Sequence, residues 1–314
     1  MITRADVVAA QDRIEGRVRR TPVTEVDPGA FPGPAWLKLE LLQHTGSFKA
    51  RGAFNRILAA HLDGELDPAV GVVAASGGNA GLAHAFAAAA LGVPATVFVP
   101  TTAPAVKVAR LRTLGATVVL SGSEYAAANE AAVEHAEGSG AVFCHAYDQL
   151  AVVAGAGTLG LELLDQVDGF DTVLVAVGGG GLMAGVATAL EGRARVVGVE
   201  PVTIPTLADA LTAGGPVDVA VSGVAADSLG ARRIGTIAYD VAVRTGVRSV
   251  LVTDDDLVAA RRLIWDHRRL VVEHGAAAAL AALTSGAYVP EAGERVVVVL
   301  CGANTDPGDL VADR

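Results

Sequence analysis

Lys49 is placed where an amine could take part in chemistry. It follows the polar turn Thr45-Gly46-Ser47 and opens a predicted helix that continues through Phe54. A cation in the first turn of a helix faces the positive end of the helix dipole, which lowers the lysine pKa and favours the neutral amine. A neutral amine can form a Schiff base with a carbonyl compound. The position alone is also compatible with an ordinary surface lysine.

The other two lysines, Lys38 and Lys107, have ordinary settings. The alternating pattern of Trp36-Leu37-Lys38-Leu39-Glu40 predicts a strand with Lys38 opposite its apolar face. Lys107 lies between two valines on a predicted helix, where a solvated amine is expected.

Four glycines, Gly178, Gly179, Gly180 and Gly181, join a predicted buried strand to a helix that starts near Leu182. Glycines at such a junction let backbone N–H groups approach an anion, and the helix N-terminus adds favourable potential. The turn is not a Walker loop, because no Lys-Ser/Thr pair follows it. We interpret it as an anion-binding turn, with a tight turn that binds nothing as the alternative.

Two further segments are rich in glycine. Ser76-Gly77-Gly78-Asn79 ends a predicted strand and begins a helix, so its amides and hydroxyl could hold a carboxylate, although Asn79 could equally be only a helix cap. Gly155-Ala156-Gly157-Thr158-Leu159-Gly160 has the spacing of a dinucleotide fingerprint, but the segment before it is a poor strand. We interpret these glycines as sites of close helix packing.

The composition narrows the classes of partner. The chain has 314 residues, 52% of them hydrophobic, and a formal net charge of −10. Such an acidic chain does not favour nucleic acid, which requires clustered Lys and Arg. Cys144 and Cys301 both lie in apolar segments, so we expect no disulfide and a cytoplasmic location. The N-terminus has no signal-peptide pattern. Thr172–Leu190 is uncharged, but its glycines favour a buried strand, turn and helix over a membrane span.

The pattern of elements predicts an α/β fold. Strands at 70–75, 95–99, 117–120 and 141–144 alternate with helices at 79–91, 106–114 and 124–137. A second series has strands at 172–177, 195–199 and 296–300, and helices at 182–190, 255–268 and 276–283, with Asp254 as a helix cap. Apolar strands alternating with helices indicate parallel or mixed sheets covered on both faces. We expect two lobes, with residues 1–45 plus 142–314 forming the large cofactor-binding domain and residues 46–141 the small one.

Taken together, the motifs resemble the fold-type II pyridoxal-phosphate family, whose fold is like that of the tryptophan synthase β chain. Within it the chain is most similar to serine/threonine dehydratases of the catabolic type, which lack a regulatory domain. The resemblance extends from about residue 20 to residue 304. Its motifs, in the family's order, are Thr45–Ala53, Ser76–Ala83, Gly178–Leu182, Val272-Glu273 before Gly275-Ala276-Ala277, and Leu300–Asn304.

The resemblance implies roles for individual residues. Lys49 would bind pyridoxal 5′-phosphate as a Schiff base and move the substrate's Cα proton, and Phe48 would pack on the cofactor. The residues Ser76, Gly77, Gly78 and Asn79 would hold the carboxylate of a small amino-acid substrate. Asn79 would also hydrogen-bond the 3′-oxygen of the ring. Gly178 to Leu182 would bind the phosphate, and Cys301 would face the pyridine nitrogen.

Cys301 bears on the reaction type. A thiol with a reference pKa of about 8.5 cannot force protonation of the ring nitrogen. Carbanion charge would therefore be short-lived, which favours prompt loss of a β-hydroxyl. The expected activity is α,β-elimination of L-threonine or L-serine to 2-oxobutanoate or pyruvate and ammonia. Cys301 could also be simply a small buried residue.

Several alternatives remain open. A serine racemase of the same family would carry a serine at the position of Gly77, which cannot transfer a proton. A β-replacement enzyme such as a cysteine synthase, or a dehydratase of a bulkier β-hydroxy amino acid, is also compatible. From a different class, the chain could be an NAD-binding enzyme or a non-catalytic binder of small molecules.

The family also suggests an ion and an assembly state. Relatives bind a cation after the strand that ends near Glu200. Here Glu200 is retained as a candidate ligand, and the Ile204 carbonyl with the Thr206 hydroxyl would suit a monovalent ion such as K⁺ better than Mg²⁺. We expect a homodimer, and no isoleucine feedback through an added C-terminal domain.

Overall fold

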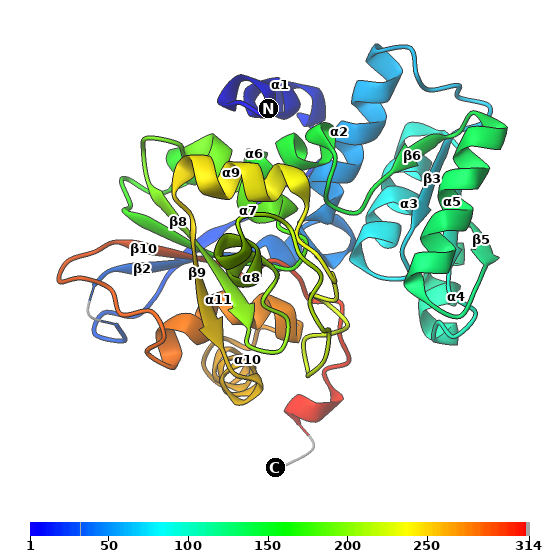
Figure 1. Cartoon of the computed structure of the whole chain (residues 1–314). Coiled ribbons are helices and arrows are strands. Elements are labelled where there is room, and N and C mark those ends of the chain that lie inside the picture. Colours follow the sequence, from blue (N-terminus) through cyan, green and yellow to red (C-terminus); the bar gives the residue numbers. More distant parts are fainter. Residues whose placement is uncertain (32, 312–314) are drawn as a thin grey trace.

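The computed structural model describes residues 1–31 and 33–311 and has the predicted two-lobed α/β architecture (Figure 1). The larger lobe is built on a mixed six-stranded sheet and the smaller on a parallel four-stranded one. The described residues also form three short 3₁₀ turns: η1 (Glu40–Leu42), η2 (His44–Gly46) and η3 (Gly308–Leu310).

The large sheet has one antiparallel edge and is otherwise parallel. Its strands, in spatial order, are β1 (Val23–Glu25), β2 (Ala35–Lys38), β10 (Val296–Val299), β7 (Thr172–Ala176), β8 (Arg195–Pro201) and β9 (Arg248–Val252). The central strands β7 and β10 are fully buried, as expected for strands with both faces covered.

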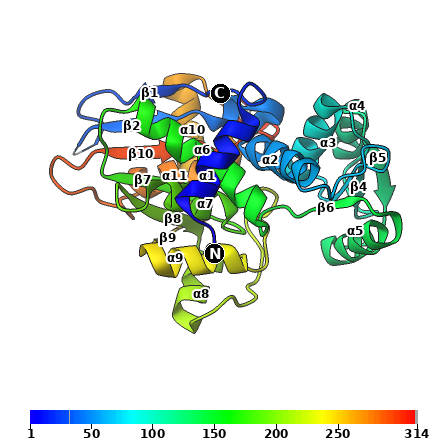
Figure 2. The same ribbon diagram turned by 90° about the horizontal axis from the view of Figure 1, so that it is seen from above.

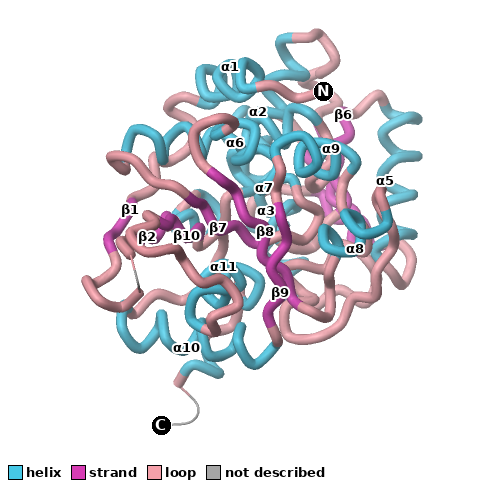
Figure 3. The backbone as a smooth tube through the Cα atoms, turned by 60° about the vertical axis from the view of Figure 1, so that its left-hand side comes forward, coloured by secondary structure: helices cyan, strands magenta, loops and turns pink. Residues whose placement is uncertain are grey.

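Helices cover both faces of this sheet (Figures 1 and 3). On one side lie α1 (Arg4–Ile14), α6 (Leu150–Gln166), α7 (Gly181–Leu190) and α9 (Thr236–Thr245). On the other side lie α10 (Asp254–Arg268) and α11 (His274–Thr284). The short α8 (Thr206–Ala213) follows β8, and α1 crosses over α6 and α7 (Figure 2).

The small lobe repeats this layering around the strand order β5 (Thr117–Leu120), β4 (Ala95–Val99), β3 (Val72–Ala75) and β6 (Val142–Cys144). Alternate residues of β3 face opposite sides: Val72 and Ala74 belong to the apolar cluster formed with α2 (Lys49–Leu62), α3 (Asn79–Leu91) and α4 (Ala105–Thr113). Val73 and Ala75 pack instead against α5 (Tyr125–Ser139). Both faces are therefore covered.

Most predicted elements are confirmed within one or two residues, and three details differ. β6 pairs with β3 in the small sheet, whereas the predicted boundary placed residues from 142 in the large domain; the rest of that division stays a prediction. The cap of α10 is Thr253, not Asp254, because its hydroxyl accepts from the Asp256 amide in a capping box. The sequence patterns also did not predict several elements, namely α6, β1, α1, α8, α9 and β9.

The glycines of α6 do pack closely against neighbouring helices. A Cβ at Gly157 would lie 2.6 Å from the Gly185 carbonyl oxygen, and one at Gly155 would lie 2.5 Å from the Arg51 carbonyl oxygen. Gly155 to Gly160 lie inside a helix instead of at a strand-to-helix turn, so the dinucleotide fingerprint lacks the structure it needs. Among the described residues, no helix has the length and apolarity needed to cross a membrane.

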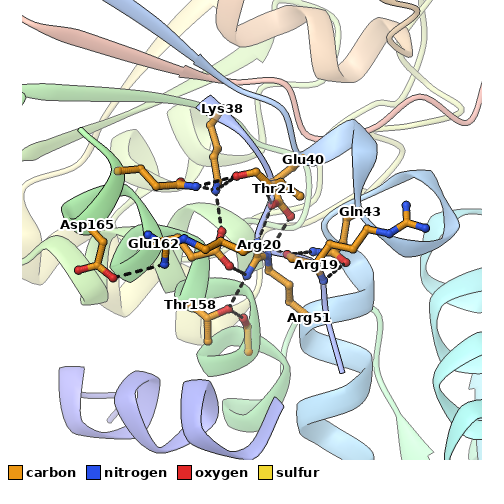
Figure 4. A network of polar contacts seen from close by, with 12 residues as sticks. Arg19, Arg20, Thr21, Lys38, Glu40, Gln43, Arg51, Thr158, Glu162 and Asp165 are labelled. Atoms are coloured by element: carbon orange, nitrogen blue, oxygen red, sulfur yellow. Dashed lines mark hydrogen bonds and ion pairs between the residues drawn. The ribbon is translucent and has the colours of Figure 1, made fainter. Parts of the chain in front are cut away.

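A buried ionic cluster joins the start of α2 to the large lobe (Figure 4). Arg51 pairs with both oxygens of Glu40, at 2.7 and 2.9 Å, and with Glu162 at 2.7 Å. Its two remaining N–H groups reach Thr158 and the Arg19 carbonyl. All five guanidinium donors are thus used. Burial alone would lower the Arg51 pKa, but the carboxylates of Glu40 and Glu162 outweigh it and raise the pKa above its ordinary value.

Lys38 belongs to the same cluster, which corrects the prediction that it lies away from the apolar side in an ordinary setting. Its amine is fully buried and donates to Glu162 at 2.6 Å, to Gln166 at 2.7 Å and to the Thr21 carbonyl at 2.9 Å. Two cations therefore face two carboxylates, and the cluster is neutral as a whole. Alternation along a strand could not reveal that the second face of β2 is covered as well.

Arg51→Lys should destabilise the protein by about 3 kcal/mol or more. The planar guanidinium of Arg51 binds two buried carboxylates, and the ammonium of a lysine cannot satisfy both of them. Urea unfolding measures this loss. Arg56→Lys on the same helix is the matched control: its partner Glu65 is exposed, so the cost should stay below about 1 kcal/mol. Equal losses for both variants would show that the cluster has no special role.

Candidate active site

The predicted site residues meet at the carboxyl ends of strands from both sheets, where α/β proteins bind ligands. The glycine turn follows β7, Cys301 follows β10, and Ser76 follows β3. A larger open groove of about 600 Å³ lies near the opposite ends of β7 and β8, lined by Asp171 and Arg195 among others. None of the predicted site residues lines that groove.

Lys49 is the first residue of α2, as predicted. Its side chain is partly buried, and its amine donates to the Ala146 carbonyl at 2.7 Å and lies 5.0 Å from the centre of the Phe48 ring. Burial lowers the Lys49 pKa to about 8, against the opposing charge of the Glu273 carboxylate. The predicted lowering of the Lys49 pKa is confirmed, but its cause is desolvation more than the helix dipole.

The segment before Lys49 is held against the end of β10. Ser47 forms an isolated bridge with Gly302. On either side of it, the Phe48 amide donates to the Cys301 carbonyl at 3.0 Å, and the Ala303 amide donates to the Gly46 carbonyl at 2.9 Å.

Thr45, at the start of this segment, has φ +60°, a left-handed conformation that β-branched residues rarely adopt. Its carbonyl accepts from Asn304 at 2.8 Å. These contacts fix where Lys49 enters the site.

The glycine turn packs against Tyr147. A Cβ at Gly179 would lie 2.4 Å from the Tyr147 ring, and one at Gly181 would lie 2.8 Å from the Tyr147 carbonyl oxygen. Gly180 has φ +82°, where only glycine is unstrained. Packing therefore gives part of the reason for the glycines. The turn still leads into the first amides of α7, the groups of a helix that lack intrahelical partners.

Lys49 and the glycine turn line one small cavity of about 10 Å³. Its lining residues are Phe48, Lys49, Gly52, Ala146, Tyr147, Val152, Ala156, Gly181 and Leu182. The structure thus brings the amine and the anion-binding candidate together, although Lys49 and Gly181 are 132 positions apart in the chain. A cavity of this size holds about one water, so a larger ligand requires its lining side chains to move.

Asn79 has its amide oriented by two partners. Its Nδ2 donates to both oxygens of Glu273, at 2.8 and 3.1 Å, while its Oδ1 accepts from Asn304 at 2.5 Å. A flipped amide would place oxygen against a carboxylate, so only one orientation satisfies both partners. In the rest of this loop, the Ser76 hydroxyl accepts from the Gly78 amide at 3.2 Å. Gly77 has room for a side chain, because a Cβ there would meet only Val99 at 3.5 Å.

Glu273 is a buried carboxyl that sequence reasoning noted only as part of a motif. Burial raises its pKa to about 7, in spite of the hydrogen bonds from Asn79 and the Asn304 backbone. Gly302 makes room for it, since a Cβ there would lie 2.4 Å from a carboxyl oxygen of Glu273. Near neutral pH, Glu273 therefore exists in both protonation states beside Asn79.

Cys301 is buried, and burial raises its thiol pKa well above the ordinary value. The thiol is therefore protonated at neutral pH and carries no negative charge toward the site. This agrees with the prediction that Cys301 is a neutral group.

The three residues predicted to hold a cation are close together but already bonded. Glu200 accepts hydrogen bonds from Thr206, Ser249 and two backbone amides, and the Ile204 carbonyl accepts from the Thr206 amide. No cluster of three or more His, Cys, Asp or Glu side chains suitable for a metal occurs within the described parts of the chain. The monovalent cation stays a prediction.

Sequence reasoning missed Tyr147, and it gave no role to Glu273, Asn304 or Arg51. Tyr147 follows β6 by only three residues, so the rule that ligand sites lie at strand carboxyl ends could have identified it. The contact between Asn79 and Glu273 joins residues 194 positions apart, and no local pattern predicts such a pair.

Comparison with known proteins identifies related chains. A profile of the family described as pyridoxal-phosphate dependent enzyme matches residues 14–302. A phenylserine dehydratase from Ralstonia pickettii is 42% identical, over 96% of this chain and 92% of the relative. An L-threonine ammonia-lyase from Thermotoga maritima is 35% identical, over 98% of this chain and 76% of the relative. The crystal structure of serine racemase from Dictyostelium discoideum superposes with a TM-score of 0.89 at 30% identity, covering 97% and 99% of the two chains.

The low pKa of Lys49 can be tested without any ligand, because neutral amines alone undergo reductive methylation. In the cofactor-free protein, the labelling rate of Lys49 should rise with pH to a midpoint near 8 and then level off. Glu273→Gln should move the midpoint lower, since the Glu273 carboxylate raises the Lys49 pKa. Peptide mass spectrometry resolves the three lysines.

Glu65→Gln provides the control, because Glu65 pairs with Arg56 on the surface and should leave the midpoint unchanged. A midpoint near the ordinary lysine value of 10.5 would contradict the account of a desolvated amine.

Proposed function

Because the chain belongs to the family of pyridoxal-phosphate dependent enzymes, we propose that it is a dehydratase of β-hydroxy amino acids. It would convert L-threonine or L-serine into 2-oxobutanoate or pyruvate, with release of ammonia. The observation that carries this proposal is the shared cavity, in which the Lys49 amine and the glycine turn at Gly181 face the same space.

The residues fit the cofactor chemically. A desolvated amine suits an aldehyde, amides at a helix N-terminus suit a phosphate, and a neutral thiol suits an unprotonated ring nitrogen. The buried hydroxyls of Thr45 and Ser47 find no hydrogen-bond partner among the described residues, so polar groups beside Lys49 are available to a ligand. Lys49 would hold the cofactor, Gly178 to Leu182 its phosphate, Asn79 its ring oxygen and Cys301 its ring nitrogen.

When bound, pyridoxal 5′-phosphate supplies an electron sink for charge that develops at the substrate's Cα. The chain's own residues do the rest. With a pKa of about 8, the Lys49 amine is neutral often enough at neutral pH to take the Cα proton. The loop from Ser76 to Asn79 would bind the substrate carboxylate with its amides and the Ser76 hydroxyl. Phe48, beside the amine, would pack against the cofactor and exclude water.

Cys301 favours elimination over reactions that need a stored carbanion. Its thiol is neutral and buried, so it does not hold a proton on the ring nitrogen as a carboxylate would. The β-hydroxyl of the substrate then leaves soon after the Cα proton. Gly77 offers no proton donor for the opposite face of Cα, which makes racemisation the slower outcome.

A second candidate substrate is a β-hydroxy amino acid with a larger side chain. It is supported by the 42% identity to the phenylserine dehydratase, compared with 35% to the L-threonine ammonia-lyase and 30% to the serine racemase. The two candidates share every proposed catalytic group and differ only in the side chain that the site must accept.

Two further expectations belong to this proposal. Cys144 and Cys301 are free and buried, which suits a reducing compartment such as the cytoplasm. A homodimer is expected from the resemblance, and gel filtration with light scattering would test it.

A panel of β-hydroxy amino acids decides the substrate. With pyridoxal 5′-phosphate bound, 2-oxo acid release from L-threonine, L-serine or L-phenylserine should be at least 100-fold faster than for Lys49→Ala, which lacks the base. Lys107→Ala is the control and should retain activity, since its amine pairs with Asp227. No 2-oxo acid release from any member of the panel would contradict the assignment.

Gly77→Ser tests the distinction from a racemase. The wild type should release pyruvate from L-serine faster than it forms D-serine. Because a side chain at residue 77 has room beside Val99, the variant should fold normally and form D-serine at least tenfold faster than the wild type. Gly77→Ala fills the same space without a proton donor, so its racemisation should stay at the wild-type rate. Chiral chromatography follows both products.

A further inference from the structure

Thr206, the first residue of α8, is bonded to the first glycine of the turn. Its hydroxyl lies 2.6 Å from the Gly178 carbonyl oxygen and 2.9 Å from Oε1 of Glu200. Both Thr206 and Glu200 are fully buried. The hydroxyl is therefore the link between the turn and a carboxyl group at the end of β8.

The Thr206 hydroxyl is the donor in both contacts. A hydroxyl has one proton, and both of its neighbours, a carbonyl and a carboxylate, are acceptors. The proton is therefore shared between the Gly178 carbonyl and Oε1 of Glu200, with the shorter contact to Gly178.

The other contacts of Glu200 occupy its remaining acceptor sites. Oε1 accepts from the Leu207 amide at 2.7 Å, and Oε2 accepts from the Ala208 amide at 2.9 Å and from Ser249 at 2.6 Å. Each oxygen thus has two hydrogen-bond contacts, which is the full capacity of a carboxyl group. The carboxyl group of Glu200 is therefore held on every side, and it gives the Thr206 hydroxyl a fixed partner.

The turn is fixed on its other sides by the chain itself. The main chain of Leu229 lies against Gly178, where an added Cβ would approach its Cα to 3.2 Å. The carbonyl of Gly179 accepts from the Gly235 amide at 3.0 Å. Thr206 supplies the anchor on the β8 side, so that its loss would free the first residue of the turn.

We propose that Thr206 is a positioning residue that fixes the phosphate-binding turn by linking Gly178 to Glu200. The inference rests on the proposed role of Gly178 to Gly181 in phosphate binding. It implies that the link governs the affinity for the phosphate group and not for the pyridine ring.

Thr206→Val, which keeps the shape and removes the hydroxyl, tests the link. Visible-absorbance titration of the cofactor-free protein gives the Kd for pyridoxal 5′-phosphate and for pyridoxal, which lacks the phosphate. Thr206→Val should raise the Kd for pyridoxal 5′-phosphate about tenfold, as expected for the loss of one buried hydrogen-bonded anchor, and change the Kd for pyridoxal less than twofold. Thr206→Ser, which keeps the hydroxyl, should have the same ratio of the two Kd values as the wild type. Thr212→Val makes the same change at an exposed site of α8 and should have no effect.

Each alternative result has a defined meaning. Equal Kd values for Thr206→Val and wild type, or a parallel rise for both ligands, would overturn the inference. If Thr206→Val does not fold, Ser249→Ala removes an outer contact of the same link and should raise the Kd two- to threefold. Failure of the wild type to bind pyridoxal 5′-phosphate would instead overturn the proposed function itself.

Discussion

The buried guanidinium of Arg51 is the constraint on which the site depends. It lies two residues after Lys49 and binds Glu40 of the large lobe, Glu162 of α6 and the carbonyl of Arg19. An ionic group this deep is stable only when every donor is satisfied, so the start of α2 has one position relative to the large lobe. The lysine that opens α2 is fixed with it, at the edge where the strands of both sheets end.

The position of α2 against the large lobe also determines the protonation of the groups in the site. The lobes together remove water from the Lys49 amine, the Cys301 thiol and the Glu273 carboxyl, and each group shifts toward its neutral form. A site of neutral groups beside helix amides can accept a dianionic phosphate and still supply a base.

Sequence patterns predicted the alternation of strands and helices, and the helix that begins at Lys49, because continuous apolar runs and capping signals are local. They also predicted the glycine turn and its junction with α7. They could not predict that Lys38 is buried, that Glu273 touches Asn79, or that Thr206 binds Gly178. Each of those contacts joins segments whose proximity is decided by how the strands order in the sheets. The resemblance to a family supplied the roles that spacing alone left open.

The central claim is that Lys49 and the glycine turn serve one cofactor. Borohydride reduction of the protein loaded with pyridoxal 5′-phosphate, followed by peptide mass spectrometry, identifies the lysine that holds it. The chain has three lysines, so the result is unambiguous. We expect the cofactor mass on the peptide that contains Lys49 and on no other. Attachment at Lys107 or Lys38, or no attachment at all, would contradict the account.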